Sequence, residues 1–260
     1  MLDLAIEAAT EAGRMIKMHS GRAMKVESKS GQETNLVTDL DRKAEELIIR
    51  TIKKRYHNHD FLAEESGSHE TKSDYRWVID PIDGTTNFTH GLPIYCVSIG
   101  LEHRGELILG VVYDPNRDEL FTAEKGKGAF LNKRPIRVSG TRTLIEALVV
   151  TGFPYDVRSN PGHVVQHFNN FLMAAQAVRR LGSAALDLCY VAAGRFDGYW
   201  EVTLNPWDMA AGVLILEEAG GKFTDLEGFP STIHRKSLLT SNGIIHEQMV
   251  EVLKRVKGEG

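Results

Sequence analysis

The sequence predicts an α+β fold, and three observations point to that class. Apolar residues recur at helical spacing near both ends of the chain and in its second half. Residues 95–138 instead consist of apolar runs interrupted by three turn-forming segments at hairpin spacing, which predicts an antiparallel meander. Short apolar runs between the helices of the second half predict further strands. Helices and strands that are partly segregated and partly mixed are typical of this class.

Composition and charge exclude several classes of protein. The chain has 260 residues, 42% hydrophobic and 25% charged, so it is neither disordered nor too short to bury a large core. Its formal net charge of -4 provides no overall positive field that would attract nucleic acid or anionic lipid. The two cysteines, Cys96 and Cys189, lie far apart and do not form a disulfide framework or a metal motif. With no apolar run of membrane-helix length and an acidic N-terminal segment, we expect a cytoplasmic protein without a signal peptide.

The first part of the chain is predicted to begin with two amphipathic helices. Apolar positions in residues 2–16 recur at helical spacing. Thr38 is a suitable N-cap for a second helix, whose apolar stripe continues to Ile52. Residues 61–63 and 76–80 are predicted to be strands that precede the meander.

The second part of the chain mixes both kinds of element. The pattern predicts strands at residues 144–151, 196–202, 222–224 and 238–241, and helices at residues 163–181, 184–195, 206–216 and 245–256. Asn205 and Pro206 suit the N-cap and the first position of the third helix, and two glycines follow its end. We expect two closely joined parts, residues 1–140 and 141–260, in one compact unit.

Residues 77–87 carry the strongest chemical signal. An apolar strand is predicted to end at Asp80, a proline restricts the next backbone torsion, and Asp83 follows, so two carboxylates can converge. Mg²⁺ prefers oxygen ligands such as these carboxylates and the carbonyl of Ile82. The segment therefore predicts a site for a divalent cation.

The residues that follow can bind an anion. Gly84 allows the backbone to approach a ligand closely, and its N–H group with those of Thr85 and Thr86 can form a phosphate cradle at the start of a helix. Taken alone, the segment also satisfies ordinary turn chemistry, in which Asp side chains accept hydrogen bonds from backbone N–H groups. A capped turn is therefore the alternative to a metal and phosphate site.

Two acids elsewhere in the sequence can join this site. Glu64 follows a short predicted strand, and Asp208 lies in the first turn of a predicted helix, where the helix dipole favours a carboxylate. Taken singly, Glu64 is more typical of a solvated loop and Asp208 of an ordinary helix start.

Four segments give the sequence a specific resemblance. They are Leu36-Val37-Thr38-Asp39-Leu40-Asp41, Ala63-Glu64-Glu65-Ser66, Asp80-Pro81-Ile82-Asp83-Gly84-Thr85-Thr86-Asn87 and Pro206-Trp207-Asp208-Met209-Ala210-Ala211-Gly212. In this order they resemble the inositol monophosphatase family over essentially the whole chain, with the nearest similarity to its bacterial SuhB-type branch. The resemblance implies a layered α-β-α-β-α sandwich of the superfamily shared with fructose-1,6-bisphosphatases. It also implies a magnesium-dependent, lithium-sensitive enzyme that forms a homodimer.

The resemblance implies roles for individual residues. Glu64, Asp80 and the Ile82 carbonyl match a first metal site, and Asp80, Asp83 and Asp208 match a second. Asp41 and Thr85 match the pair that orients and deprotonates the attacking water, with Glu64 also holding water. Gly84 and Thr85 match the phosphate contact, and Asp83 and Asp208 also border the substrate. Ser183, Ala184 and Glu201 match a pocket for substrate hydroxyls, Asp187 either closes its floor or caps its own segment, and Lys29 matches a lysine near the metal-binding loop.

Hydrolysis of a phosphate monoester fits these residues. A phosphate dianion repels hydroxide, so catalysis depends on charge neutralisation and positioning, which carboxylates with bound Mg²⁺ supply. We expect hydrolysis of myo-inositol 1-phosphate or a similar sugar or polyol monophosphate by direct attack of a metal-activated water. The alternatives are a dual inositol monophosphatase and fructose-1,6-bisphosphatase, and a SuhB-like partner of the transcription machinery that acts in RNA processing.

Overall fold

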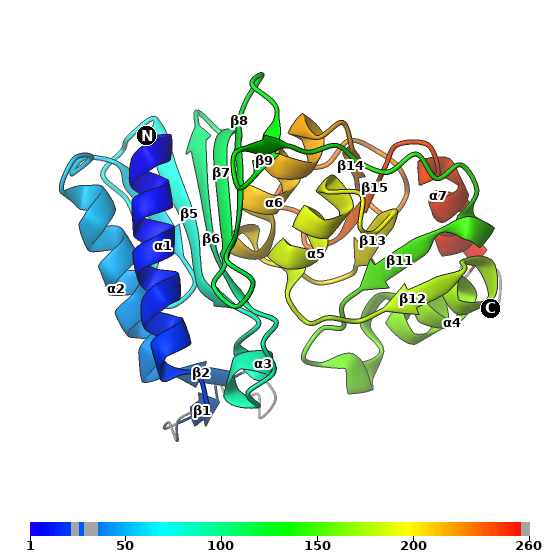
Figure 1. The fold of residues 1–260 in the computed structure, drawn as a ribbon. Helices are drawn as coiled ribbons and strands as arrows, with labels where there is room; N and C mark the ends of the chain where they lie inside the picture. The colour runs from blue at the N-terminus through cyan, green and yellow to red at the C-terminus, as the bar shows by residue number, and fades with distance from the viewer. Residues whose placement is uncertain (22–25, 29–35, 256–260) are drawn as a thin grey trace.

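Helices and sheets alternate in layers through the molecule (Figure 1). The structure, a computed structural model, describes residues 1–21, 26–28 and 36–255, without the side chains of 26–28, 36 and 37. In order, the layers are α1 (Leu2–His19) with α2 (Asp39–Lys53), an eight-stranded sheet, α5 (Ala184–Ala192) with α6 (Pro206–Glu218), a five-stranded sheet, and α4 (Val164–Ala174) with α7 (His246–Lys254). This arrangement is the α-β-α-β-α sandwich that the resemblance implies, and the expected fold class is confirmed.

The larger sheet contains the predicted meander. Its strand order is β10 (Arg134–Pro135), β9 (Ala129–Leu131), β8 (Glu119–Glu124), β7 (Glu106–Asp114), β6 (Cys96–His103), β5 (Tyr75–Asp83), β3 (Asp60–Ala63) and β4 (Gly67–His69). All neighbours are antiparallel except β3 and β5. The turn between β6 and β7 contains Arg104 and Gly105, both with positive φ, so the turn falls where the sequence predicts it.

Helices α1 and α2 cover the outer face of this sheet. The buried side of α1 is mostly alanine, including Ala5, Ala8 and Ala12, which lets the helix lie close to its neighbours. In α2 the hydroxyl of Thr38 accepts a hydrogen bond from the N–H of Leu40, so the predicted N-cap is present. These helices and the sheet enclose one hydrophobic core.

Helix α6 rests directly on the other face of the sheet. A Cβ atom at Gly100 of β6 would lie 2.7 Å from the Cβ of Ala210, and one at Gly110 of β7 would lie 2.6 Å from the carbonyl oxygen of Ala211. The two glycines therefore allow backbone of α6 and backbone of the sheet to meet. This contact determines how deeply the N-terminal turn of α6 enters the molecule.

The smaller sheet lies between the middle and the outer helices. Its order is β12 (Ala177–Arg179), β11 (Leu148–Thr151), β13 (Gly198–Glu201), β15 (Leu238–Ser241) and β14 (Lys222–Thr224), with β11 parallel to both of its neighbours. The remaining short elements are β1 (Val26–Ser28), β2 (Leu36–Thr38), α3 (Thr85–Thr89) and 3₁₀ helices at Leu144–Glu146, Val157–Ser159 and Pro161–His163. The strand predicted over residues 144–151 is thus shorter than expected, because its first residues form a 3₁₀ turn.

The prediction of a helix over residues 163–181 is wrong in its second half. Helix α4 ends at Ala174, and the chain continues as the edge strand β12. The register pairs Ala177 with Leu148 in parallel, so backbone pairing with β11 decides the conformation even though the apolar spacing suits a helix. Arg179 accordingly lies in a strand and not at the end of a helix.

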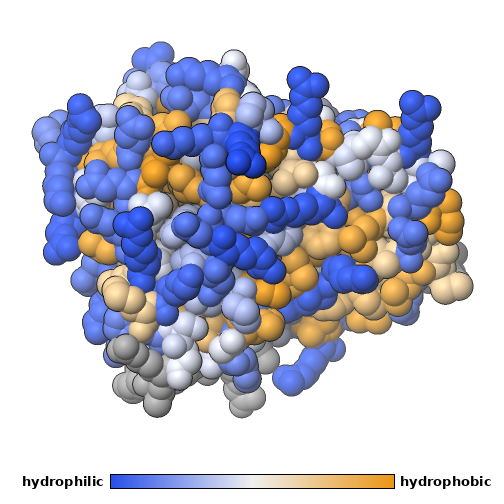
Figure 2. Space-filling view, in the orientation of Figure 1, coloured by the Kyte–Doolittle hydropathy of each residue, from blue (hydrophilic) through white to orange (hydrophobic). Residues whose placement is uncertain are grey.

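Part of the surface is hydrophobic. Figure 2 shows hydrophobic side chains over the side of the molecule that carries β11, β12 and α4 in Figure 1. Exposed large apolar side chains include Ile145, Leu172 and Met173, of which Met173 is 84% exposed. In the described ranges of the chain, no helix is both long and apolar enough to cross a membrane.

Candidate active site

The end of β5 carries two of the predicted metal ligands. Asp80 and Asp83 are three residues apart, so they would point to opposite faces of a regular strand. The pairing of β5 with β6 changes register between them, at Pro81, which has no backbone N–H group for the ladder. The N–H of Ile82 donates to Asp80 Oδ1 at 3.0 Å. Both carboxylates interact electrostatically with Asp208.

Glu64 lies in the turn between β3 and β4, which the neighbouring elements hold firmly. Its own N–H donates to the carbonyl oxygen of Ile79 at 3.2 Å. The N–H groups of Glu65 and Ser66 donate to the two carboxylate oxygens of Glu45, at 2.7 and 2.8 Å. Glu45 belongs to α2 and is 3% exposed. A buried carboxylate therefore fixes the turn that positions Glu64.

Asp208 reaches the same place from α6. Its Oδ2 accepts a hydrogen bond from the N–H of Asn205 at 2.7 Å, as expected for an acid in the first turn of a helix. The hydroxyl of Ser98 on β6 lies 3.4 Å from the carbonyl oxygen of Trp207. The N-terminal turn of α6 is thus held at the sheet beside β5.

Glu64, Asp80, Asp83 and Asp208, here called the acid cluster, perturb one another. Burial raises the pKa of Asp80 well above its usual value, and the charges of Glu64 and Asp83 raise it further. Burial also raises the pKa of Asp208, and the charges of Asp83 and Glu64 add to that shift. For Asp83, burial raises the pKa while the hydrogen bonds that it accepts lower it. A cation bound among these carboxylates would relieve their repulsion.

Asp41 and Thr85 are brought into contact by the fold. The hydroxyl of Thr85 lies 3.1 Å from Asp41 Oδ1 and 3.0 Å from the carbonyl oxygen of Ile82, and its single proton is donated to one of them at a time. Asp41 Oδ2 accepts hydrogen bonds from the N–H and the hydroxyl of Thr38, at 2.9 and 2.5 Å. Asp41 is completely buried. The carboxylate is therefore held with one oxygen directed at Thr85.

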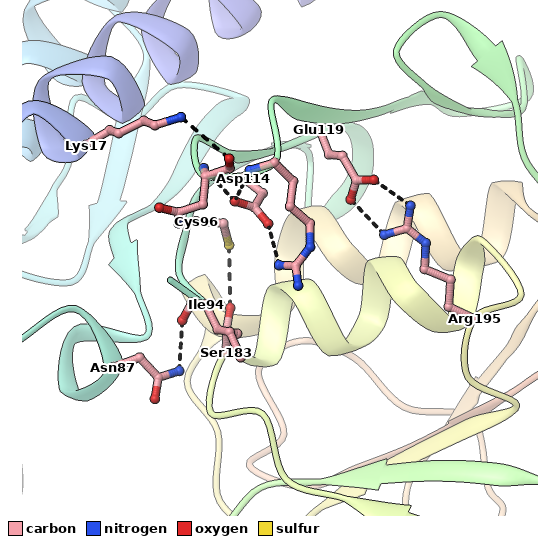
Figure 3. A network of polar contacts seen from close by, with 10 residues as sticks. Lys17, Asn87, Ile94, Cys96, Asp114, Glu119, Ser183 and Arg195 are labelled. Atoms are coloured by element: carbon pink, nitrogen blue, oxygen red, sulfur yellow. Dashed lines mark hydrogen bonds and ion pairs between the residues drawn. The ribbon is translucent and has the colours of Figure 1, made fainter. Parts of the chain in front are cut away.

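Asp83 also connects the acid cluster to the N-terminus of α5. Its Oδ2 accepts hydrogen bonds from the Ser183 hydroxyl at 2.6 Å and from the Ala185 N–H at 2.7 Å, and its Oδ1 accepts one from the Ala184 N–H at 3.2 Å. The Sγ of Cys96 lies 3.7 Å from the Ser183 hydroxyl (Figure 3). Ser183 and Ala184, predicted at the substrate pocket, therefore also serve to hold Asp83.

Gly84 starts α3 at the predicted phosphate contact. It has a left-handed backbone conformation with φ 104°, and a Cβ atom there would lie 2.8 Å from the carbonyl oxygen of Ile94, so only glycine fits. The first N–H groups of a helix, here from Thr85 onward, have no partners within the helix. Asn87 Nδ2 donates to the carbonyl oxygen of Ile94 at 2.8 Å (Figure 3). It also donates to the carbonyl oxygen of Leu181 at 2.8 Å, which ties this loop to the segment before α5.

Glu201 lies at the end of β13 on the smaller sheet. It is 8% exposed, and the hydroxyl of Tyr199 donates to its Oε2 at 2.5 Å. Burial raises the pKa of Glu201 to about 7, although the Tyr199 hydrogen bond and the charge of Arg180 lower it.

Asp187 on α5 is 1% exposed, and its Oδ1 has no partner among the described residues. Burial raises the pKa of Asp187, and the charge of Glu201 raises it further.

The donors of the site suit a hard cation. They are the carboxylates of the acid cluster and the carbonyl of Ile82. Mg²⁺ binds oxygen ligands, takes few of them from the protein and keeps several waters. Across the described part of the chain, no three or more His, Cys, Asp or Glu side chains are arranged so that they could hold a metal ion by themselves. Two features of the site nevertheless suit Mg²⁺. Its donors are oxygen atoms, and its carboxylates repel one another when no cation is bound.

Sequence reasoning missed two residues of this site. Glu45 had a signal, because it lies four positions after Asp41 on the apolar face of an amphipathic helix, where an acid needs a partner. Tyr155 had none. Desolvation and the charges of the acid cluster raise its pKa, although its side chain is 46% exposed. Lys29, predicted near the metal-binding loop, lies outside the described residues.

Known proteins resemble this chain along nearly its whole length. The inositol monophosphatase family matches residues 1–257. An inositol-1-monophosphatase from Synechocystis sp. is 45% identical over 253 residues, which cover 97% of this chain and 88% of that protein. A Nus factor SuhB from Pasteurella multocida is 47% identical over 230 residues, 88% of this chain and 86% of that protein. The crystal structure of the extragenic suppressor protein SuhB from Bartonella henselae matches with a TM-score of 0.93 and 42% identity, covering 99% of this chain and 98% of that one. This chain belongs to the inositol monophosphatase family.

Proposed function

We propose that this chain is a magnesium-dependent phosphoric monoester hydrolase that acts on myo-inositol 1-phosphate or a similar sugar or polyol monophosphate. The observation that carries the proposal is the position of the Thr85 hydroxyl, 3.1 Å from Asp41 Oδ1 and 3.0 Å from the carbonyl oxygen of Ile82, beside the buried acids Asp80 and Asp83. The electrostatic coupling within the acid cluster supports it. The name of the similar Synechocystis protein, inositol-1-monophosphatase, supports this substrate class. Membership in the family supports metal dependence.

In this proposal the residues of the site have different roles in hydrolysis. Glu64, Asp80 and the Ile82 carbonyl would hold one Mg²⁺, and Asp80, Asp83 and Asp208 a second. Metal held there would lower the pKa of a bound water and neutralise charge on the phosphate. Thr85 orients the attacking water and passes its proton to Asp41, whose Oδ1 lies 3.1 Å from the Thr85 hydroxyl. The N–H groups of Gly84 and Thr85 bind phosphate oxygens, and water attacks phosphorus directly, without a covalent enzyme intermediate. The ester P–O bond breaks, and the leaving alkoxide takes a proton from solvent to give the alcohol.

The alcohol part of the substrate lies on the side of the smaller sheet. The carboxylate of Glu201 accepts hydrogen bonds from substrate hydroxyls. Ser183 and Ala184 border the same region because they start α5, where they also hold Asp83. The site therefore has a phosphate side and a hydroxyl side joined through Asp83.

Phosphate release from myo-inositol 1-phosphate, with and without Mg²⁺, tests the proposal. Asp83→Asn should abolish the magnesium-dependent release, because it removes a proposed ligand. Asp3→Asn is the matched control, because Asp3 is an exposed acid in the first turn of α1. Release that persists in Asp83→Asn would reject the site, and release by neither variant nor wild type would reject the substrate. Incorporation of solvent ¹⁸O into phosphate without a trapped phosphoenzyme is expected for direct attack by water.

A second candidate function is a regulatory one. The similar Pasteurella multocida protein is named a Nus factor, which supports a partner in the transcription machinery. If that role is separate from hydrolysis, Asp83→Asn should bind purified RNA polymerase as wild type does. Fructose 1,6-bisphosphate belongs in the same phosphate-release assay, because a dual activity would show release from both substrates.

We also propose a cytoplasmic homodimer that lithium inhibits. The exposed apolar side chains of Ile145, Leu172 and Met173 provide surface that a second copy can cover. Light scattering after size-exclusion chromatography should give about twice the monomer mass, and a monomeric mass would reject the dimer. Addition of Li⁺ to the magnesium-dependent assay should lower phosphate release.

A further inference from the structure

The carboxylate of Glu201 lies in a tightly built environment. A Cβ atom at Gly152 would lie 2.0 Å from Glu201 Oε2 and 2.5 Å from Oε1, so both oxygens lie against the backbone that follows β11. Tyr199, two residues earlier on β13, is completely buried and directs its hydroxyl to Oε2 at 2.5 Å. Residues two apart on a strand lie on the same face, so this contact follows from the strand geometry. The carboxylate is therefore confined by backbone on one side and by a phenol on another.

We propose that Tyr199 is a positioning residue that determines substrate specificity, because its hydroxyl orients the Glu201 carboxylate to accept hydrogen bonds from polyol hydroxyls. This inference rests on the proposed function, in which Glu201 contacts the alcohol part of the substrate. It adds a residue that does not itself touch the phosphate or the acid cluster. Its effect should therefore depend on whether the substrate carries hydroxyl groups.

The hydrogen bond has a defined direction. Burial raises the pKa of Tyr199 well above its usual value, and the charge of Glu201 raises it further, so the phenol keeps its proton and donates it. A carboxylate has two oxygens that accept several hydrogen bonds. Oε2 is engaged by Tyr199, which leaves Oε1 and the remaining lone pairs for a ligand. Donation from Tyr199 also favours the ionised form of Glu201, which accepts hydrogen bonds and donates none.

The charged neighbours of Glu201 also affect whether its carboxyl group is ionised. Two charged groups affect Glu201: Asp83 at the end of β5 and Arg180 in the segment before α5. Glu201 in turn raises the pKa of Asp187 on α5. The charge of Asp83 raises the pKa of Glu201, whereas the charge of Arg180 lowers it. The side chain of Arg180 is exposed, so water screens its charge. The fully buried Tyr199 supplies the donor that water does not weaken.

The test compares two substrates in the magnesium-loaded enzyme. Tyr199→Phe should lower kcat/KM for myo-inositol 1-phosphate about tenfold, the effect of losing a hydrogen bond to a charged group. It should change kcat/KM for p-nitrophenyl phosphate less than about twofold, because that ester carries no other hydroxyl. Tyr95→Phe is the matched control: Tyr95 is equally buried, but its hydroxyl has no hydrogen-bond partner among the described residues. The Mg²⁺ activation constant should be unchanged in both variants. Tyr199→Phe should remain folded but have a lower Tm, because a buried carboxylate loses its donor.

A double-mutant cycle separates positioning from general packing. If Tyr199 acts through Glu201, Tyr199→Phe combined with Glu201→Gln should be no worse on myo-inositol 1-phosphate than Glu201→Gln alone. Equal losses on both substrates, or additive losses in the cycle, would overturn the inference. An unchanged ratio of the two kcat/KM values in Tyr199→Phe would overturn it as well. Failure of the proposed function is distinguishable, because wild type itself would then release no phosphate from myo-inositol 1-phosphate.

Discussion

Replacement of Gly100 by alanine tests how the fold positions Asp208. Gly100 lies in β6 under α6, where a Cβ atom would be 2.7 Å from the Cβ of Ala210 and 3.2 Å from the N of Ala211. Carbon atoms in contact prefer a separation of about 3.7 Å, so α6 or the strand must retreat by about 1 Å. Asp208 precedes Ala210 by two residues on the same helix and moves with it. The substitution should therefore displace a proposed metal ligand without changing any polar group.

The structure sets the size of the expected effects. Overpacking of this kind costs about 1–3 kcal/mol, which corresponds to a fall in Tm of roughly 2–12 °C for a chain of this size. A displacement of about 1 Å at a reacting site costs up to about a hundredfold in rate. Gly100→Ala should thus be a folded, less stable protein with weaker Mg²⁺ binding and much lower phosphate release.

Thermal unfolding, Mg²⁺ titration by calorimetry and phosphate release measure the three effects. Gly140→Ala is the matched control, since nothing lies within 4 Å of a Cβ atom at Gly140. Gly110→Ala should behave like Gly100→Ala, because its Cβ atom would meet the carbonyl oxygen of Ala211 at 2.6 Å. If Gly100→Ala is as stable and as active as Gly140→Ala, the seating of α6 does not position Asp208. A fall in Tm with unchanged Mg²⁺ affinity would restrict the role of this contact to packing.

Two further predictions concern Mg²⁺ binding. Glu45→Gln should weaken Mg²⁺ binding about tenfold, because an amide has only one acceptor oxygen for the N–H groups of Glu65 and Ser66. The control in the same titration is Glu46→Gln, which changes an exposed neighbouring acid. Equal Mg²⁺ affinities of the two variants would refute the role of Glu45. Mg²⁺ binding should also release protons. The pKa values of Asp80 and Asp208 are raised, so the metal-free site holds protons that the metal displaces. The Mg²⁺ affinity should therefore increase as the pH rises. Calorimetry in buffers of different ionisation enthalpy measures that release, and a binding enthalpy independent of the buffer would contradict it.

Local signals in the sequence were enough to predict much of the fold. Thr38 caps the second helix as predicted, because a capping side chain and an apolar stripe are both short-range patterns. The meander follows from turn residues at hairpin spacing, and its antiparallel neighbours need no distant partner. The sequence also predicts a strand that ends at Asp80 with Asp83 just beyond it, whereas β5 continues through Pro81 to Asp83.

Other features depend on partners distant in sequence. The strand at Ala177 has a helical pattern and becomes a strand only because β11 pairs with it. Glu45 forms hydrogen bonds with a turn 20 residues away. The charges of the acid cluster raise the pKa of Tyr155, although nothing in its own sequence marks it. Neither the pairing nor these contacts are encoded by local periodicity.

The sequence by itself determined the family resemblance, the fold class and the residue types of the site, because motifs and periodicity are properties of short segments. Only the tertiary structure decided how those segments meet. The hydroxyl of Ser183 binds Asp83 across 100 residues, and the glycines of β6 and β7 set the depth of α6 and hence of Asp208. Such contacts are fixed by close packing between layers, where the absence of a single Cβ atom decides whether two backbones can touch.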